Sequence, residues 1–148
     1  MDQEDDLLKA WLDTWHHFES VVAAVLEAIG YTAKVTQKSG DHGVDVIAHP
    51  DPLGLERPYV KVQAKSGAGT VNEATVNQLE GCLNQGEQGI VVGLGGFTSG
   101  AQNVARASSH LTLFNGQQFV ALFLDHYDAL APEWRAKYPL RKVFVPFR

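Results

Sequence analysis

The sequence predicts an α/β fold in which a central mixed β-sheet is flanked by α-helices. Three observations indicate this class. Apolar residues first recur at helical spacing, short strand-like segments then follow with no helix between them, and strand-like and helix-like segments finally alternate. We expect a first helix at residues 14–29, strands at 31–36, 44–48, 59–65, 89–94 and 111–114, and later helices at 72–84, 98–109 and 116–127.

The first helix is predicted from an apolar stripe at the spacing of helical turns. Asp13 or Thr14 can serve as its N-cap, and Gly30 is suited to end it. A Gly-rich turn, SGDHG, separates the first two strands, and a loop with three prolines separates the second and third. The stripe consists of Trp15, Phe18, Val22, Val25, Leu26 and Ile29.

The second half of the chain carries clearer start signals for its helices. Thr98 or Ser99 can cap the helix that ends near residue 109, and Asn115 can cap the helix that follows. The strand at 89–94, GIVVGL, is apolar throughout, which is typical of a strand buried on both faces. A further alternating stretch lies at 142–145 in the tail.

Composition narrows the class of protein. A chain of 148 residues suits one domain with a real core. The net charge of −5 excludes a basic module that coats nucleic acid non-specifically. The single cysteine, Cys82, has no partner for an internal disulfide or a CxxC zinc site. The sequence has neither a long apolar run nor a signal peptide, so we expect a cytoplasmic protein without a membrane span.

The segment PYVKVQAKSG, residues 58–67, alternates in a way that puts an amide and an ammonium on one strand face. Gln63 and Lys65 are two residues apart and therefore lie on the same side. If this strand pairs with the strand that begins near Asp45, a carboxylate joins them. Carboxylate and amide oxygens suit Mg²⁺, and a lysine beside the ion can stabilise charge that develops on phosphorus. This is the chemistry of phosphodiester hydrolysis.

Glu19 is a further candidate, because it lies within the apolar stripe of the first helix. A carboxylate there is costly unless it is paired or close to a metal ion. It can reach the same cluster and orient Lys65 or a water molecule. The alternative is an ion pair at the edge of the helix.

The stretches GDHGVDVIA and VQAK resemble the Mrr-like branch of the PD-(D/E)xK nuclease superfamily, in which Q-x-K replaces E-x-K. Gly40, Gly43 and Asp45 fit the first half of the motif, and Gln63 and Lys65 fit the second. The resemblance continues in order along the chain, from about residue 15 to about residue 125. It is carried further by the segments FESVVAAVLEAIGY, GIVVGLGGFTSGAQNVA and LFNGQQFVALF, and the PLRKVFVP tail is similar to one that often follows such domains.

The resemblance implies a restriction-endonuclease-like fold and a Mg²⁺-dependent DNA endonuclease of the restriction or DNA-defence type, with Mn²⁺ able to substitute. Residues 1–13 would be a leading segment or the end of a linker, and residues 14–148 the nuclease domain. The resemblance leaves room for a homodimer and for a separate DNA-recognition domain outside this chain. It does not indicate which DNA is cut.

Carried over residue by residue, the resemblance assigns roles to five positions. Asp45 would bind the metal directly, Gln63 would supply its amide oxygen, and the Ala64 carbonyl would be a neighbouring ligand. Lys65 would position the attacking water and stabilise the transition state. Glu19 would act on these groups without binding the metal.

Three residues are candidates for contact with DNA: Lys38, Ser66 and Thr98. Thr98 begins a helix whose backbone N–H groups can hold a phosphate. Ser66 departs from the family, because a basic residue often follows the lysine, and this weakens the expected contact. His42 also departs, since many relatives have glycine there.

Other interpretations stay open at this point. Gln63 and Lys65 could belong to a solvent-facing strand surface, and Asp45 could be a turn carboxylate that bonds its own backbone. The chain could be a DNA-binding or scaffolding domain that keeps the fold without cleaving, or an α/β domain that works only in protein assembly. The GLGGFTSG stretch, residues 93–100, lacks the lysine and the spacing of a nucleotide-binding loop.

Overall fold

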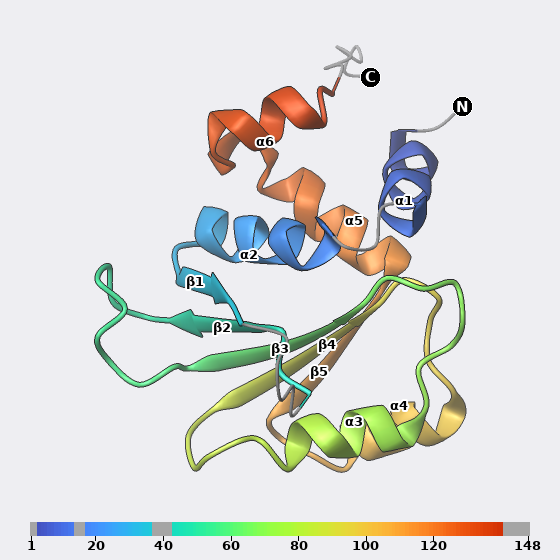
Figure 1. The fold of residues 1–148 in the computed structure, drawn as a ribbon. Helices are drawn as coiled ribbons and strands as arrows, with labels where there is room; N and C mark the ends of the chain where they lie inside the picture. The colour runs from blue at the N-terminus through green and yellow to red at the C-terminus, as the bar shows by residue number, and fades with distance from the viewer. Residues whose placement is uncertain (1–2, 14–16, 37–42, 141–148) are drawn as a thin grey trace, which may run out of the picture.

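The computed structural model describes residues 3–13, 17–36 and 43–140 and shows a five-stranded sheet in the order β1-β2-β3-β4-β5 (Figure 1). Strands β1, β2 and β3 pair antiparallel, whereas β3, β4 and β5 pair parallel, so the predicted mixed sheet is confirmed. The strands are β1 Thr32–Val35, β2 Val46–His49, β3 Val60–Lys65, β4 Gln88–Gly93 and β5 Leu111–Asn115.

Helices cover both faces of the sheet (Figure 1). Helices α1, α2 and α5 lie over one face, α3 and α4 lie over the other, and α6 packs outside the first group. Their bounds are α1 Gln3–Asp13, α2 Phe18–Ile29, α3 Glu73–Glu80, α4 Ser99–Arg106, α5 Gly116–Asp125, the 3-10 helix η2 Tyr127–Ala129 and α6 Pro132–Lys137.

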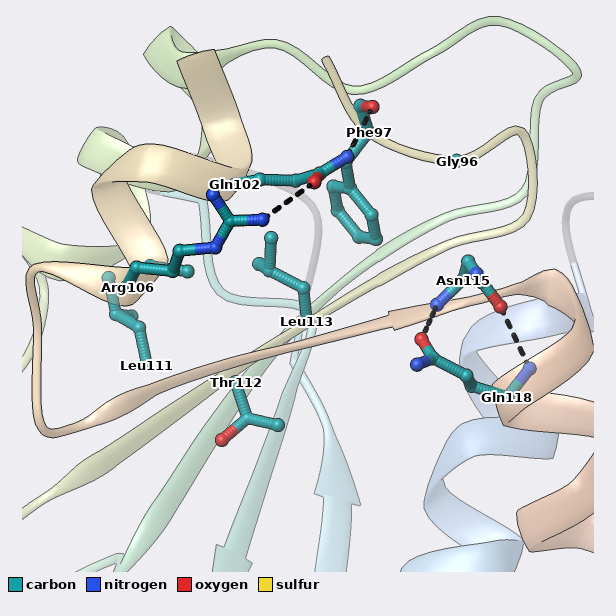
Figure 2. Close-up of a pocket in the computed structure, with 10 residues that line it drawn as sticks. Gly96, Phe97, Gln102, Arg106, Leu111, Thr112, Leu113, Asn115 and Gln118 are labelled. Carbon is teal, nitrogen blue, oxygen red and sulfur yellow. Dashed lines mark hydrogen bonds between the residues drawn. The ribbon is translucent and has the colours of Figure 1, made fainter. Parts of the chain in front are cut away.

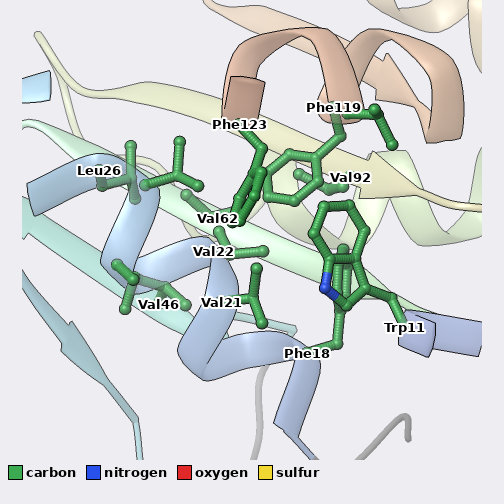
Figure 3. Close-up of a cluster of buried hydrophobic side chains, with 14 of the residues drawn as sticks. Trp11, Phe18, Val21, Val22, Leu26, Val46, Val62, Val92, Phe119 and Phe123 are labelled. Carbon is green, nitrogen blue, oxygen red and sulfur yellow. The ribbon is translucent and has the colours of Figure 1, made fainter. Parts of the chain in front are cut away.

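The larger core lies between the sheet and helices α1, α2 and α5 (Figure 3). The Trp11 ring of α1 packs edge-on against Phe119 and Phe123 of α5, with ring centroids 5.3 and 5.1 Å apart. Trp11 is only 1% exposed. Residues 3–13 therefore form a helix that shares its core with α2 and α5.

The predicted caps of the later helices are confirmed. Thr98 Oγ1 accepts from Ala101 N at 3.1 Å at the start of α4. The side chains of Asn115 and Gln118 form a reciprocal capping box at the start of α5. Because caps depend on residues three positions apart, they can be predicted from sequence alone.

The predicted start of the first long helix was wrong. Helix α2 begins at Phe18, and its N-cap is His17, whose side chain makes no capping bond. Asp13, proposed as a cap, is instead the last residue of α1. Gly30 ends α2 as expected, with φ of +129°.

The last part of the chain was only partly foreseen. Helix α6 was not predicted; it begins with Pro132 at its first position, where proline's missing N–H costs nothing. The alternating stretch at 142–145 lies outside the described residues. Within the described part of the chain, every helix is too short or too polar to cross a lipid bilayer.

Candidate active site

The candidate site lies at the carboxyl end of β3. Gln63 is 3% exposed, so the solvent-facing interpretation of this residue was wrong. It lies opposite Val91 of β4, whose side chain belongs to the core beneath α3 and α4, and this helix layer buries the amide. Lys65, the last residue of β3, is exposed. The strand therefore carries one buried and one exposed polar group within three residues.

Asp45 lies directly before β2 and contacts β3 on either side of Gln63. Its backbone N donates to Val62 O at 2.8 Å, and its carboxylate Oδ2 accepts from Ala64 N at 2.7 Å. The structure therefore brings Asp45 to the strand that carries Gln63 and Lys65. The antiparallel pairing of β2 with β3 produces this approach.

The turn before Asp45 requires glycine at position 43. Gly43 is buried with φ of +88°, and a Cβ added there would lie 2.9 Å from Gln78 Cδ. The left-handed backbone strains any larger residue, and the Gln78 side chain would also have to move. Gly40, Lys38 and His42 lie outside the described residues.

Gln63 Oε1 is the feature of this site that most clearly suits a ligand. Among the described residues it is one of two buried side-chain oxygen or nitrogen atoms that have no hydrogen-bond partner. A buried amide oxygen without a partner is costly, because it has lost its water and gained nothing in exchange. Such an oxygen close to a carboxylate suits a hard cation, which prefers oxygen ligands.

The donor set for a cation is small. In the parts of the chain that the structure describes, no group of three or more His, Cys, Asp or Glu side chains is placed to share a metal ion. A cation at this site would rely on the Asp45 carboxylate and neutral oxygens such as Gln63 Oε1. This composition fits Mg²⁺, which usually keeps several waters and takes only one or two carboxylates from the protein.

Glu19 and Lys65 line a cavity of about 350 Å³ together with Ser66 and residues of α1 and α2. The apolar part of its wall comes from Leu12 and Phe18. Asp45 and Gln63 are not among the lining residues, so the candidate residues form two adjoining groups that meet at the end of β3. The contribution of α1 was not foreseen, because Leu12 lies in a segment whose role the sequence left open.

The structure also places the remaining DNA-contact candidates. Ser66 lines the Glu19–Lys65 cavity, directly after β3. The Thr98 hydroxyl accepts the capping bond of α4, and Thr98 N donates to Val71 O at 2.9 Å. Thr98 N is therefore already hydrogen-bonded to another loop and is not available to a phosphate.

An ion pair that sequence reasoning missed lies two residues before Gln63. Lys61 Nζ is 2.9 Å from Glu87 Oε1 and donates to Cys82 O at 2.8 Å. Glu87 also accepts from Asn84 N at 2.7 Å. Burial works against ionisation of Glu87, but hydrogen bonds from Asn84 and Lys61 outweigh it and hold the pKa of this carboxyl below its usual value.

Comparison with known proteins decides the family. A family model described as restriction endonuclease matches residues 13–123. The chain belongs to the restriction endonuclease family. The resemblance carried by Asp45, Gln63 and Lys65 is thereby confirmed at the level of the family, and nuclease chemistry is the activity that membership implies.

Two curated relatives and one solved structure illustrate this restriction endonuclease kinship. The chain is 31% identical over 116 residues to the type IV methyl-directed restriction enzyme EcoKMrr of Escherichia coli, covering 74% of this chain and 38% of that one. It is 29% identical over 117 residues to the uncharacterized protein y4cE of Sinorhizobium fredii, covering 76% and 30%. The chain thus spans less than two fifths of either relative.

The solved structure is the MspJI restriction endonuclease in complex with a 27-mer oligonucleotide. It superposes with a TM-score of 0.62 at 24% identity, covering 88% of this chain and 32% of that one. This similarity shows the fold and confirms the predicted restriction-endonuclease-like architecture.

Proposed function

We propose that this chain is a metal-dependent DNA endonuclease domain that hydrolyses phosphodiester bonds. The observation that carries the proposal is the buried Gln63 Oε1 without a partner, on the strand that the Asp45 carboxylate contacts. A buried oxygen without a hydrogen-bond partner destabilises the folded protein, and this suits a site that binds a cation.

Mg²⁺ is the cation that this oxygen set suits best, and Mn²⁺ would substitute for it. Asp45 and Gln63 would hold it with their side chains, and Ala64 with its carbonyl oxygen. When bound, such an ion polarises a phosphoryl oxygen and makes a water molecule a better nucleophile. The amide of Gln63 adds no charge, so affinity would depend on the phosphate that DNA brings.

Lys65 would act on the reacting phosphate. This residue is exposed at the end of β3 and lines the cavity that Glu19 also lines. There it would position the attacking water and stabilise the negative charge that develops on phosphorus. The Glu19 carboxylate would orient this ammonium, and Ser66 would add a hydroxyl beside the substrate backbone.

DNA is the proposed substrate, in a restriction or DNA-defence role. The chain spans 38% of EcoKMrr, so target choice would belong to a recognition domain outside the 148 residues. A homodimer would place two such sites on the two strands of a duplex. A DNA substrate also suits the cytoplasmic location expected from the sequence.

Cleavage of supercoiled plasmid tests this function. The wild-type chain should convert plasmid to nicked or linear forms in Mg²⁺ or Mn²⁺, and EDTA should stop the reaction. Lys65→Met should lower the rate about a hundredfold, because one electrostatic partner of the transition state is lost. Calorimetry should show that Lys65→Met still binds Mg²⁺.

The matched control is Lys9→Met, which removes one exposed lysine from helix α1. It should leave the cleavage rate within about twofold of wild type, since Lys9 does not line the Glu19–Lys65 cavity and exposed charges act weakly. Undiminished cutting by Lys65→Met, or equal losses in the two variants, would contradict the role assigned to Lys65.

A further inference from the structure

A second cavity, of about 460 Å³, runs along β5 beneath α4 (Figure 2). Its apolar wall is formed by Leu111 and Leu113 of β5 and by the ring of Phe97, which follows β4. Its polar lining includes Arg106 at one end and Asn115 with Gln118 at the other. We call this cavity the β5 groove.

The polar groups at one end of the β5 groove are oriented as donors. Asn115 Oδ1 accepts from Gln118 N at 2.8 Å, and Gln118 Oε1 accepts from Asn115 N at 2.9 Å. This capping box uses both amide oxygens and fixes both side chains. Each side chain keeps an NH₂ group that can donate to a ligand.

The other end of the groove is also rich in donors. Gln102 Oε1 accepts from Arg106 at 3.4 Å, and Gln102 Nε2 donates to Phe97 O at 3.2 Å. The residues lining the groove include one arginine and no aspartate or glutamate. The groove therefore suits a ligand that presents acceptors to these donors and a flat apolar face to Phe97.

The groove lies at the same edge of the sheet as the candidate catalytic lysine. Lys65 is in register with Gly93 of β4, and Gly93 is in register with Asn115 of β5. Two strand spacings of about 4.8 Å put the backbones of Lys65 and Asn115 about 10 Å apart. Ligands of open α/β sheets commonly bind at this carboxyl edge.

We infer that the β5 groove binds an unpaired nucleotide of the DNA substrate close to the scissile bond. The face of its base would rest on Phe97 and Leu113, and base acceptors would face the Asn115 and Gln118 amides. A base within a duplex hides its face by stacking, so only an unstacked nucleotide can make this contact. The inference rests on the proposed DNA nuclease function and adds a preference for DNA with unpaired nucleotides near the cut.

Gln118→Glu tests the inference while keeping the capping box. Glutamate at this helix position accepts the same bond from Asn115 N, and its charge suits a helix N-terminus, so the melting temperature should not fall. It loses the NH₂ donor and adds a negative charge inside the groove. Gln117→Glu is the matched control, since Gln117 is exposed in the same turn and does not line the groove.

The measurement is fluorescence anisotropy in EDTA with two labelled oligonucleotides, a blunt duplex and a duplex with a short single-stranded overhang. Wild type should bind the overhang more tightly. Gln118→Glu should weaken overhang binding about tenfold, as expected for one lost hydrogen bond plus like-charge repulsion, and blunt binding less than about threefold. Gln117→Glu should weaken both by the same small factor.

An overhang with an abasic first nucleotide separates base binding from phosphate binding. If the base occupies the groove, this probe should remove most of the difference between wild type and Gln118→Glu. Equal effects of the Gln117 and Gln118 variants, or a difference that persists on the abasic probe, would overturn the inference. Binding in EDTA requires no cleavage, so a chain that cuts no plasmid can still pass this test, and one that cuts plasmid can fail it.

Discussion

Lys61 and Gln63 lie on the same face of β3, two residues apart, yet the polar group of Lys61 has partners and the amide oxygen of Gln63 has none. The Lys61 ammonium is bonded to Glu87 and to Cys82 O. The Gln63 amide oxygen is buried and has no hydrogen-bond partner. Lys61 and Gln63 occupy equivalent polar positions in the alternating pattern of β3, so local sequence does not explain the difference.

The contrast separates a polar group that supports the fold from one that suits a ligand. Buried polar groups are nearly always satisfied within a protein, and an exception needs a reason. At Lys61 the neighbouring turn supplies Glu87, which closes the cluster. At Gln63 the residue before β2 instead brings its carboxylate to the strand, where Asp45 Oδ2 accepts from Ala64 N.

The largest effect, on the rate of DNA cleavage, is expected at the end of β3 where Gln63 Oε1 has no partner. Asp45→Asn should lower plasmid cleavage about a thousandfold, because a bound metal supplies several kcal/mol of transition-state stabilisation and each 1.4 kcal/mol is a factor of ten. The asparagine oxygen can still accept from Ala64 N, so urea unfolding should be little changed. Cleavage within tenfold of wild type would remove Asp45 from the site.

At the Lys61–Glu87 ion pair, a substitution should lower the stability of the protein and not its cleavage activity. Glu87→Leu should lower the free energy of unfolding by about 2 kcal/mol, less than for a fully buried pair because the Lys61 side chain is 15% exposed. Urea denaturation measures this, with the exposed Glu56→Leu as control. Replacing both partners, with Lys61→Met and Glu87→Leu together, should recover part of the loss.

The same pair predicts a pH dependence with a definite sign. The pKa of Glu87 is lowered in the folded protein, so its stabilisation is present at neutral pH and is lost as pH falls through the folded-state pKa. The stability difference between wild type and Glu87→Leu should therefore shrink below about pH 4, near the usual range of a carboxyl. A difference that stays constant down to pH 3 would mean that Glu87 acts by packing alone.

A negative charge at position 63 tests whether this side chain faces a metal ion. Gln63→Glu should tighten Mg²⁺ binding to the free protein about tenfold, since a carboxylate binds a hard cation more strongly than an amide oxygen does. The two side chains have nearly the same size, so the fold should persist. Calorimetric titration without DNA measures the affinity, and equal affinities would show that Gln63 does not face the metal.

The smallest effect is expected when the unsatisfied oxygen is removed altogether. Gln63→Met should raise the free energy of unfolding in EDTA by about 1 kcal/mol, because a buried oxygen without a partner is replaced by an apolar group of similar length. The same change at Lys61 should destabilise the protein. A loss of stability in both variants would mean that the Gln63 oxygen is satisfied in solution.

The features that could be predicted from the sequence are those set by neighbouring residues. The alternation of β3, the glycine at position 43, and the caps at Thr98 and Asn115 involve groups only a few positions apart. The order of these segments was enough to predict the mixed sheet and the restriction endonuclease family, both of which are confirmed.

The start of α2 and the place of α1 could not be predicted in the same way. Trp11 is followed within a few residues by more helix-forming sequence, and its packing against α5 places α1 in the core. Which side of a helix is covered depends on partners more than a hundred residues away in the chain. Leu12 enters the wall of the Glu19–Lys65 cavity for the same reason.

By itself, the sequence determined which residue types could meet at the end of β3, because a period of two and a short turn are local properties of the chain. Only the tertiary structure decided that Gln63 is buried without a partner while Lys61 is paired. It also decided that Asn115 lies two strands from Lys65 beside a groove. These outcomes depend on which helices cover each face of the sheet and on the order of the strands. Both arise from contacts between distant segments, and such contacts do not produce a periodic pattern in the sequence.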